Sequence, residues 1–390
     1  MSTQPLTLAR KIIFSLLLLV LGTVLALGFG EMTVRLVAPQ QLIMFRPDIW
    51  RPADSLGWAQ QANIDTRVNT GDRTVTLVTD SNGFRVAPEG RPVGEYRVLL
   101  IGDSFMQALQ VEYDASLAGL AEQCFQAHTG HTLAVWNTGV GGWDPPQYAI
   151  EAKRALASRP FDLVLVSVFL GNDIVTRRQV FRPREPDPRR DLRMPRHLSW
   201  REFIDAILAP INDGLETRSH LFIFLKDRFQ GLLMRFGLTA LEIPTELRRD
   251  QAASARWQLT ADILAEIDSV ARLQDVSTLF MLVPSIEQVD SAALQLRVRA
   301  FGVDPSTLDV DQPDRLLAAE LERRRLAFVS LLPAFRLAHA RGVSLYGRVD
   351  PHFSPDGHRL AWNVVAPRLA AALHVPYWPI DDSGPPCGAP

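Results

Sequence analysis

The chain has 390 residues, 47% of them hydrophobic and 22% charged, with 41 Lys and Arg against 43 Asp and Glu. This composition excludes wholesale disorder, and the formal charge of -2 excludes a globally basic nucleic-acid-binding protein. The two cysteines, Cys124 and Cys387, are too few for a disulfide scaffold or a cysteine-rich zinc module. Sequence alone leaves open whether they pair with each other.

The segment Ile12–Gly30 reads IIFSLLLLVLGTVLALGFG and holds 19 residues without a charge. At 1.5 Å per residue it spans about 28 Å, close to one hydrocarbon core. Its length favours an uncleaved transmembrane anchor over a cleaved signal peptide, although Ala26–Gly28 is an acceptable cleavage site. A buried core helix is disfavoured, because the segment is apolar on every face. Arg10 and Lys11 precede it, which predicts a cytoplasmic segment 1–11 and a remainder outside the cytoplasmic membrane.

Residues 31–95 are predicted to form a stalk or a cap on the main domain. The stretch 38–72 is rich in Pro, Gln, Asp and Asn and contains Trp50 and Trp58. Thr74–Thr79 is strand-like, and Asp80–Gly83 is typical of a turn.

Strands and helices alternate in the domain predicted over residues 96–375. Apolar runs predict strands at Val98–Ile101, Thr132–Trp136, Phe161–Phe169, Ser277–Val283 and Ala327–Ser330. Helical patterns occupy Gln107–His128, Pro145–Ala157, Ala253–Leu273, Asp314–Arg325 and Leu360–Leu373. This alternation predicts an α/β fold with a mainly parallel five-stranded sheet covered on both faces.

A helical insertion is predicted at residues 176–250, between the third and fourth strands. Its first part carries many arginines between 177 and 201, and its second part, 200–238, has apolar residues at helical spacing. We favour a solvated surface or a lid over the site, with a patch that contacts anionic lipid or glycan as the alternative. The Pro- and Gly-rich segment 376–390 is expected to be a flexible tail.

Polar residues that suit acyl transfer follow three predicted strands and precede the last helix. Ser104 lies on a strand-to-helix turn, where its hydroxyl can act as a nucleophile. His352 can accept the serine proton, and Asp350 can orient that histidine. The Ser104 N–H, the Gly142 N–H and the Asn172 side chain are the expected donors of an oxyanion hole.

Each of these features is common when it occurs alone, and their joint occurrence in chain order makes them specific. Asp103 and Asp173 are expected to support the site by hydrogen bonds to loop N–H groups. His358 is an alternative base, and we prefer His352 because it lies beside Asp350. The histidines show no metal-ligand spacing, so no metal site is predicted.

The motifs GDSF at 102–105, NTGVGGW at 137–143, LGNDI at 170–174 and DPHFSPDGH at 350–358 together resemble those of the SGNH (GDSL-type) hydrolases. The chain looks most similar to a membrane-anchored subgroup with an N-terminal helix, and the resemblance covers about residues 70–375. It implies a flavodoxin-like three-layer α/β/α sandwich and a Ser/His/Asp esterase without a cofactor. In that family Ser104 would be the nucleophile, His352 the base and Asp350 the orienting acid, with Gly142 and Asn172 in the oxyanion hole.

The sequence departs from the family pattern at two points. One residue separates Asp350 from His352 where the family usually has two, and Leu170 stands where a glycine is usual. The Asp–His spacing resembles that of SGNH-like proteins that O-acetylate bacterial exopolysaccharides such as alginate.

Three functions therefore compete. The first is a membrane-anchored esterase that acts on O-acyl groups of a cell-envelope glycan or lipid. The second is an O-acyltransferase that uses the same residues to acetylate an exopolysaccharide. The third is an inert glycan-binding module of the same fold. The intact set of Ser104, His352 and Asp350 favours an enzyme.

Overall fold

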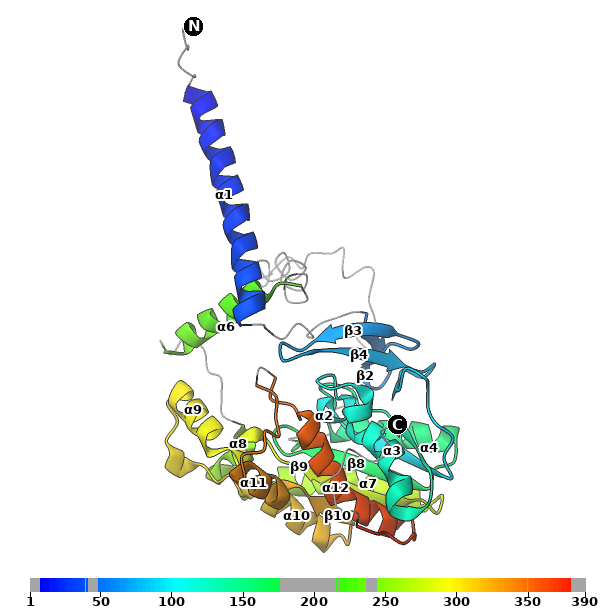
Figure 1. Ribbon diagram of the computed structural model, residues 1–390. Coiled ribbons are helices and arrows are strands. Elements are labelled where there is room, and N and C mark those ends of the chain that lie inside the picture. Colours follow the sequence, from blue (N-terminus) through cyan, green and yellow to red (C-terminus); the bar gives the residue numbers. More distant parts are fainter. Residues whose placement is uncertain are drawn as a thin grey trace, which may run out of the picture.

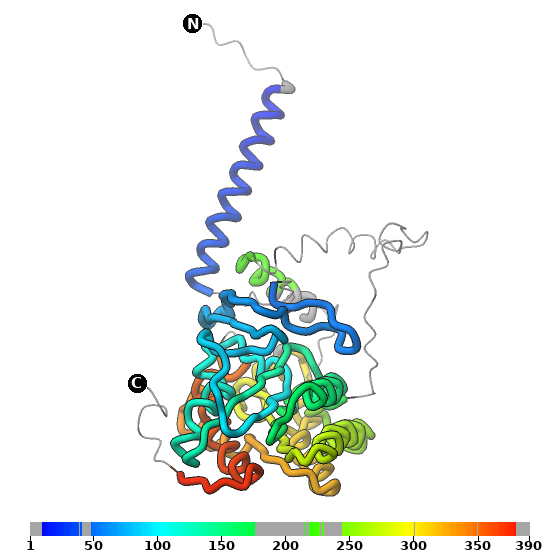
Figure 2. Tube along the Cα trace, turned by 90° about the vertical axis from the view of Figure 1, so that its right-hand side faces the viewer, coloured from blue at the N-terminus to red at the C-terminus, as the bar shows by residue number. Residues whose placement is uncertain are grey.

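The computed structural model describes residues 8–38, 40, 48–175, 215, 218–235, 244–348 and 350–379. One long helix, α1 (Leu8–Val37), projects from a body that contains all the described strands (Figure 1). Figure 2, turned by 90°, shows the same projecting helix above the body. The residues expected at the site all lie in the body, away from the N-terminal end of α1.

An eight-stranded sheet forms the centre of the body, in the order β10-β9-β8-β6-β7-β5-β4-β3. Its strands are β3 (Asp65–Asn69), β4 (Thr74–Thr79), β5 (Arg85–Val86), β6 (Tyr96–Ile101), β7 (Leu133–Asn137), β8 (Leu163–Phe169), β9 (Ser277–Val283) and β10 (Phe328–Ser330). The five strands from β10 to β7 run parallel, whereas β5, β4 and β3 are added antiparallel at one edge. The α/β class and the mostly parallel sheet are confirmed, but five strands were too few.

The three additional strands come from the segment that we expected to be a stalk or cap. A separate hairpin, β1 (Trp50–Ala53) with β2 (Gly57–Gln60), precedes them. The alternating pattern of β4 buries Val75 and Leu77, which explains why this segment joins the sheet. The sheet therefore begins well before residue 96, where we expected the domain to begin.

Helices cover both faces of the parallel strands. Besides α1, the described helices of the chain are α2 (Ser104–Gln107), α3 (Leu117–Thr129), α4 (Pro145–Ser158), α6 (His220–Arg235), α7 (Arg256–Arg272), α8 (Ile286–Val289), α9 (Ser291–Phe301), α10 (Gln312–Arg323), α11 (Leu332–Ala340) and α12 (Pro355–Ala372). Of these, α6 lies beside α1 rather than on the sheet (Figure 1). Along β6, Val98 and Leu100 join the core under α3 and α12, while Leu99 and Ile101 join the core under α4 and α7. The four residues Val98–Ile101 are all buried, as expected for a central parallel strand.

The single helix predicted over Gln107–His128 is replaced by two helices with an irregular connection. The short α2 ends at Gln107 because its C-cap, Ala108, has a left-handed φ of 54°, and α3 begins only at Leu117. Ser116 caps α3 by accepting a hydrogen bond from the Gly119 N–H, at 3.2 Å. The connection matters for the site described below, because its residue Gln110 is hydrogen-bonded to Asp350.

Several sequence predictions fall wholly or partly outside the described residues. Residues 176–214, which hold the arginine-rich part of the insertion, and 380–390, which include Cys387, are among them. Cys124 is buried in the core under α3 and α12. Where the tail is described, Tyr377 stacks on His128 of α3.

In the described part of the chain, α1 is the one helix that is long and apolar enough to cross a membrane. Between Ile12 and Gly30 the large apolar side chains of α1 are exposed on every side of the helix. Their exposed fractions range from 51% for Ile12 to 76% for Phe29. None of the most apolar window is buried inside the protein.

Candidate active site

The carboxyl ends of three adjacent parallel strands bring the expected site residues to one edge of the sheet. Ser104 follows β6, the Gly141–Gly142 turn follows β7, and Asn172 follows β8. Because β7, β6 and β8 are neighbours in the sheet, these three loops meet. The segment with Asp350 and His352 comes from the chain just before α12.

Ser104, His352 and Asp350 form a continuous hydrogen-bonded chain. The Oγ of Ser104 lies 2.7 Å from Nε2 of His352. The Nδ1 of His352 is hydrogen-bonded to Oδ1 of Asp350. The Asp350 side chain is fully buried, while the His352 side chain stays 21% exposed and Ser104 is half-buried. Solvent therefore reaches these three residues from the side of Ser104 and His352. This arrangement suits proton transfer from serine to histidine.

Neighbouring carboxylates raise the pKa of His352. Burial alone would lower its pKa, but the hydrogen bond and charge of Asp350, aided by Asp103, raise the pKa above the ordinary 6.5. A carboxylate can only accept, so Nδ1 carries the proton toward Asp350 and leaves Nε2 free to accept from Ser104.

The turn that carries Ser104 is built by its neighbours. Asp103 is the N-cap of α2, and its Oδ1 accepts a hydrogen bond from the Phe105 N–H at 2.9 Å. Ser104 is the first residue of α2, so its N–H has no acceptor within the helix. At Gly102 a Cβ would lie 2.6 Å from Cγ of Met106, so a larger residue would displace the turn. Burial raises the pKa of Asp103 to about 6.

The glycine turn after β7 lies against Ser104. An added Cβ at Gly141 would lie 3.7 Å from Cβ of Ser104, which places the two backbones side by side. Gly142 has a φ of +79°, a conformation that favours glycine, and an added Cβ there would lie 3.2 Å from the Trp58 ring. Trp58 Nε1 donates to the Gly141 carbonyl at 2.9 Å. The first hairpin therefore supports the turn with an aromatic ring.

Asn172 lies in the exposed turn after β8, and aromatic packing links this turn to the histidine. The N–H of Asn172 donates to the carbonyl of Phe169 at 3.3 Å. The ring of Phe169 lies 4.5 Å from that of Phe105, which in turn lies 4.8 Å from the imidazole of His352. Leu170, the departure from the family pattern, is fully buried in the core.

Asp173 is buried beneath the same turn. Its Oδ2 accepts from the Phe169 N–H at 2.7 Å and from the Tyr148 hydroxyl at 2.9 Å. Burial, and then the charge of Asp103, raise the pKa of Asp173 well above its ordinary value. These hydrogen bonds tie the turn after β8 to α4, and a role for Asp173 in supporting the site stays a prediction.

His358 lies apart from the hydrogen-bonded chain. Its Nδ1 accepts a hydrogen bond from the Leu117 N–H at the start of α3, at 3.2 Å. Burial lowers its pKa to about 3, with further contributions from Arg85 and His352. A neutral, buried histidine that fixes a helix end has no access to Ser104.

Two residues that sequence analysis missed hold Asp350 in place. Gln110, in the connection between α2 and α3, donates from Nε2 to Oδ2 of Asp350 at 2.8 Å. Asp72, in the β3–β4 turn, accepts from the backbone N–H groups of Arg348 and Asp350, each at 3.1 Å. Their partners lie 240 and 278 residues away in sequence, and no local pattern signals such contacts.

Arg85 of β5 is a third residue that the sequence did not reveal. Its guanidinium is fully buried and donates to the carbonyls of Gln107, Ala108 and Val111. It thereby shapes the connection that presents Gln110 to Asp350. Burial lowers the pKa of Arg85 to about 10, which still leaves it charged at neutral pH.

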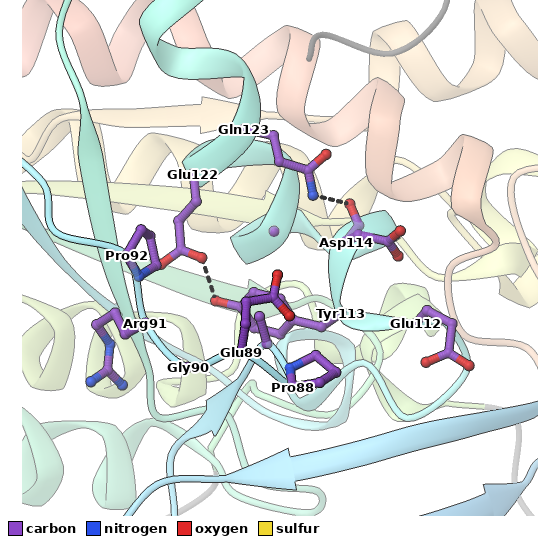
Figure 3. A pocket seen from close by; sticks show the side chains of 12 residues that line it. Pro88, Glu89, Gly90, Arg91, Pro92, Glu112, Tyr113, Asp114, Glu122 and Gln123 are labelled. Carbon is purple, nitrogen blue, oxygen red and sulfur yellow. Dashed lines mark hydrogen bonds between the residues drawn. The ribbon is translucent and has the colours of Figure 1, made fainter. Parts of the chain in front are cut away.

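Two surface pockets lie near these elements, and neither lining includes Ser104 or His352. One, of about 720 Å³, lies behind the Asp350 loop and joins the end of α1 to Asp72 and Gln110. The other, of about 510 Å³, is lined by residues 87–92 and the start of α3. Figure 3 shows Tyr113 and Glu122 of this second pocket joined by a hydrogen bond, of 2.9 Å.

No group of three or more His, Cys, Asp or Glu side chains in the described ranges is placed to hold a metal ion.

No protein-family model and no curated protein matches the chain. Solved structures that resemble it include a member of the lipolytic G-D-S-L family from Veillonella parvula, at 11% identity and a TM-score of 0.37, covering 69% of this chain and 95% of that one. An acetylxylan esterase from Geobacillus stearothermophilus is 12% identical, with a TM-score of 0.38 and coverages of 72% and 95%. A carbohydrate acetylesterase from Sinorhizobium meliloti is 12% identical, with a TM-score of 0.37 and coverages of 71% and 99%. All three are distant in sequence, so the roles of individual residues rest on the geometry above.

Proposed function

We propose that this chain is a membrane-anchored serine esterase of the SGNH type. The observation that carries the proposal is the hydrogen-bonded chain from Ser104 Oγ through His352 to the buried Asp350. An inert binding module has no need for a nucleophile, a base and an orienting carboxylate in this geometry.

The reaction would begin with attack of Ser104 Oγ on the carbonyl carbon of an ester. His352 Nε2 takes the serine proton, and Asp350 stabilises the resulting imidazolium without taking a proton itself. The Ser104 N–H, the Gly142 N–H and the Asn172 side chain would donate to the oxyanion. The imidazolium returns its proton to the departing alcohol, which leaves an acyl group on Ser104. Water, activated by His352, then releases the acid.

The proposed substrate is an O-acyl group of a cell-envelope glycan or lipid. This part of the proposal follows from α1, because an exposed apolar helix of this length is stable only in a lipid environment. Arg10 and Lys11 before the apolar run support a body on the outer side of the cytoplasmic membrane, because positive residues tend to stay on the cytoplasmic side.

The test is ester hydrolysis by the full chain in detergent, with 4-nitrophenyl acetate and longer esters. We expect Ser104→Ala and His352→Ala to lower kcat to background, a loss on the order of 10⁶-fold. Ser81→Ala, which changes an exposed serine in a turn, is the matched control and should keep full activity. Full activity of Ser104→Ala with an unchanged melting temperature would overturn the proposal.

The same assay with an added sugar acceptor separates hydrolysis from transfer. Free acid as the only product supports the esterase. If wild-type chain transfers the acyl group to the sugar in preference to water, the second step uses the sugar hydroxyl and the protein is an acyltransferase.

A further inference from the structure

Helix α6 crosses the base of α1 and is fixed to it at its first turn (Figures 1 and 2). Glu31 of α1 accepts hydrogen bonds from Ser219 Oγ at 2.7 Å, from the His220 N–H at 3.0 Å and from the Leu221 N–H at 2.9 Å. A carboxylate at this position satisfies helix N–H groups and complements the helix dipole. The start of α6 is therefore held by a residue directly after the apolar run of α1.

Two further contacts fix the direction in which α6 leaves α1. A Cβ added at Gly30 would lie 3.1 Å from Cδ2 of Leu221, so the absence of a side chain lets the helices approach closely. Arg35 donates to the carbonyl of Arg218 at 2.7 Å while it pairs with Glu31. Together these contacts leave α6 little freedom to turn relative to α1.

The face of α6 that touches α1 continues as an exposed apolar stripe. Leu221, Leu225 and Phe229 are spaced by four residues, which places them on one face of a helix. Leu221 packs on Gly30, but Leu225 is 52% exposed and Phe229 is 60% exposed. An apolar stripe that starts at the membrane anchor and that the described residues leave uncovered suits a lipid surface better than water.

We propose that α6 is an interfacial helix that lies on the membrane surface, with Leu225 and Phe229 inserted at the boundary between headgroups and acyl chains. The proposal rests on the proposed anchoring by α1 and adds a second attachment to the same leaflet. Phenylalanine and leucine on the buried side, with basic residues such as the exposed Arg228 at the headgroups, are typical of such helices.

The experiment measures the depth of spin labels in the full chain reconstituted into phosphatidylcholine–phosphatidylglycerol vesicles. Cys387→Ser leaves the buried Cys124 as the remaining native cysteine, and single labels are placed with Leu225→Cys and Phe229→Cys. Leu337→Cys on α11 is the matched control, because Leu337 is an exposed leucine in the body, at 55%. Leu19→Cys reports on α1 itself. Each variant replaces an exposed side chain, so ester hydrolysis and the melting temperature should match the parent.

We expect the labels at 225 and 229 to resemble the label at 19, with high accessibility to oxygen and low accessibility to an aqueous nickel complex. The label at 337 should show the opposite ratio. If 225 and 229 are as accessible to nickel as 337 while 19 is protected, α6 is not at the membrane although the anchor is. If 19 is also accessible to nickel, the anchoring fails and this proposal fails with it. Spin–spin broadening at 225 without lipid protection would identify a second copy as the occupant and overturn the proposal.

Discussion

At the scale of single residues, the two oxygens of the Asp350 carboxylate have separate partners. Oδ1 is hydrogen-bonded to His352 and Oδ2 to Gln110, and the Asp350 side chain is fully buried. A buried carboxylate needs such partners because an unmade hydrogen bond to a charged group is costly. The spacing of one residue between Asp350 and His352 therefore still allows the carboxylate to reach Nδ1.

This arrangement predicts how activity responds to pH. His352 must be neutral to accept the serine proton, and its pKa is raised above 6.5, so kcat/KM should fall as the pH drops through a value above 6.5. Asp350→Asn removes the hydrogen bond and charge that raise the pKa of His352. We expect this variant to move the acid limb to lower pH and to lower kcat on the order of 10⁴-fold. Asp356→Asn, an exposed carboxylate in the same segment, is the control for a pH–rate profile between pH 5 and 9.

At the scale of elements, the antiparallel edge of the sheet contributes to a site that the parallel strands carry. The β3–β4 turn holds the Asp350 loop through Asp72, β5 shapes the loop after Ser104 through Arg85, and the first hairpin supports the glycine turn through Trp58. A fragment that begins at residue 96 would lack all three contacts.

Asp72→Ala tests this connection. It leaves the N–H groups of Arg348 and Asp350 without their acceptor, so the loop that carries His352 should lose its alignment with Ser104. We expect kcat to fall by about 10²-fold with little change in KM for a small ester, because the change affects alignment of the base. Asp72→Asn keeps one acceptor oxygen and should recover part of the rate. Asp54→Ala in the β1–β2 turn, an exposed aspartate of the same segment, should have no effect.

The same elements show what the sequence can and cannot reveal. The parallel strands are recognisable because each is a continuous apolar run, and Ser104, Asp350 and His352 are recognisable because each occurs in a short motif. Of the edge strands, Thr74–Thr79 was recognisable as strand-like, but β3 escaped notice because polar residues interrupt it, and β5 because it has only two residues. Gln110, Asp72 and Arg85 act through contacts between distant segments, which only the folded chain brings together.

At the scale of the whole molecule, several buried carboxyl groups have raised pKa values. Burial raises the pKa of Glu151 in α4 to about 7, although Arg154 opposes the shift, and it raises that of Glu122 in α3 to about 7. A carboxyl whose pKa is higher in the folded state binds more protons there than in the unfolded chain. Its contribution to stability is therefore complete below the unfolded pKa and is lost as the pH rises through the folded pKa.

Glu151→Gln should remove one such contribution. The ordinary pKa of a glutamate is 4.5, and that of Glu151 in the folded chain is about 7. Ionisation of buried Glu151 should therefore lower the stability of the wild-type chain as the pH rises from 4.5 to about 7. The variant, which has no charge to bury, should be more stable than wild type at pH 8, by on the order of 3 kcal/mol. Thermal melts at pH 5 and pH 8 measure the difference. Glu322→Gln on the exposed side of α10 should melt like wild type at both values, and an equal gain in that variant would refute the explanation.

The C-terminal end of α1 lines the same pocket as Asp72 and Gln110, so the thickness of the bilayer is expected to affect the activity. A transmembrane helix adapts to a thicker or thinner hydrocarbon layer by changing its tilt. Val37 and Ala38 at the end of α1 line the same pocket as the two residues that hold Asp350, so a change of tilt would be transmitted to the catalytic loop. We expect hydrolysis of a soluble ester by the reconstituted chain to vary with the acyl-chain length of the host lipid. In detergent, where no bilayer sets the tilt, this dependence should disappear.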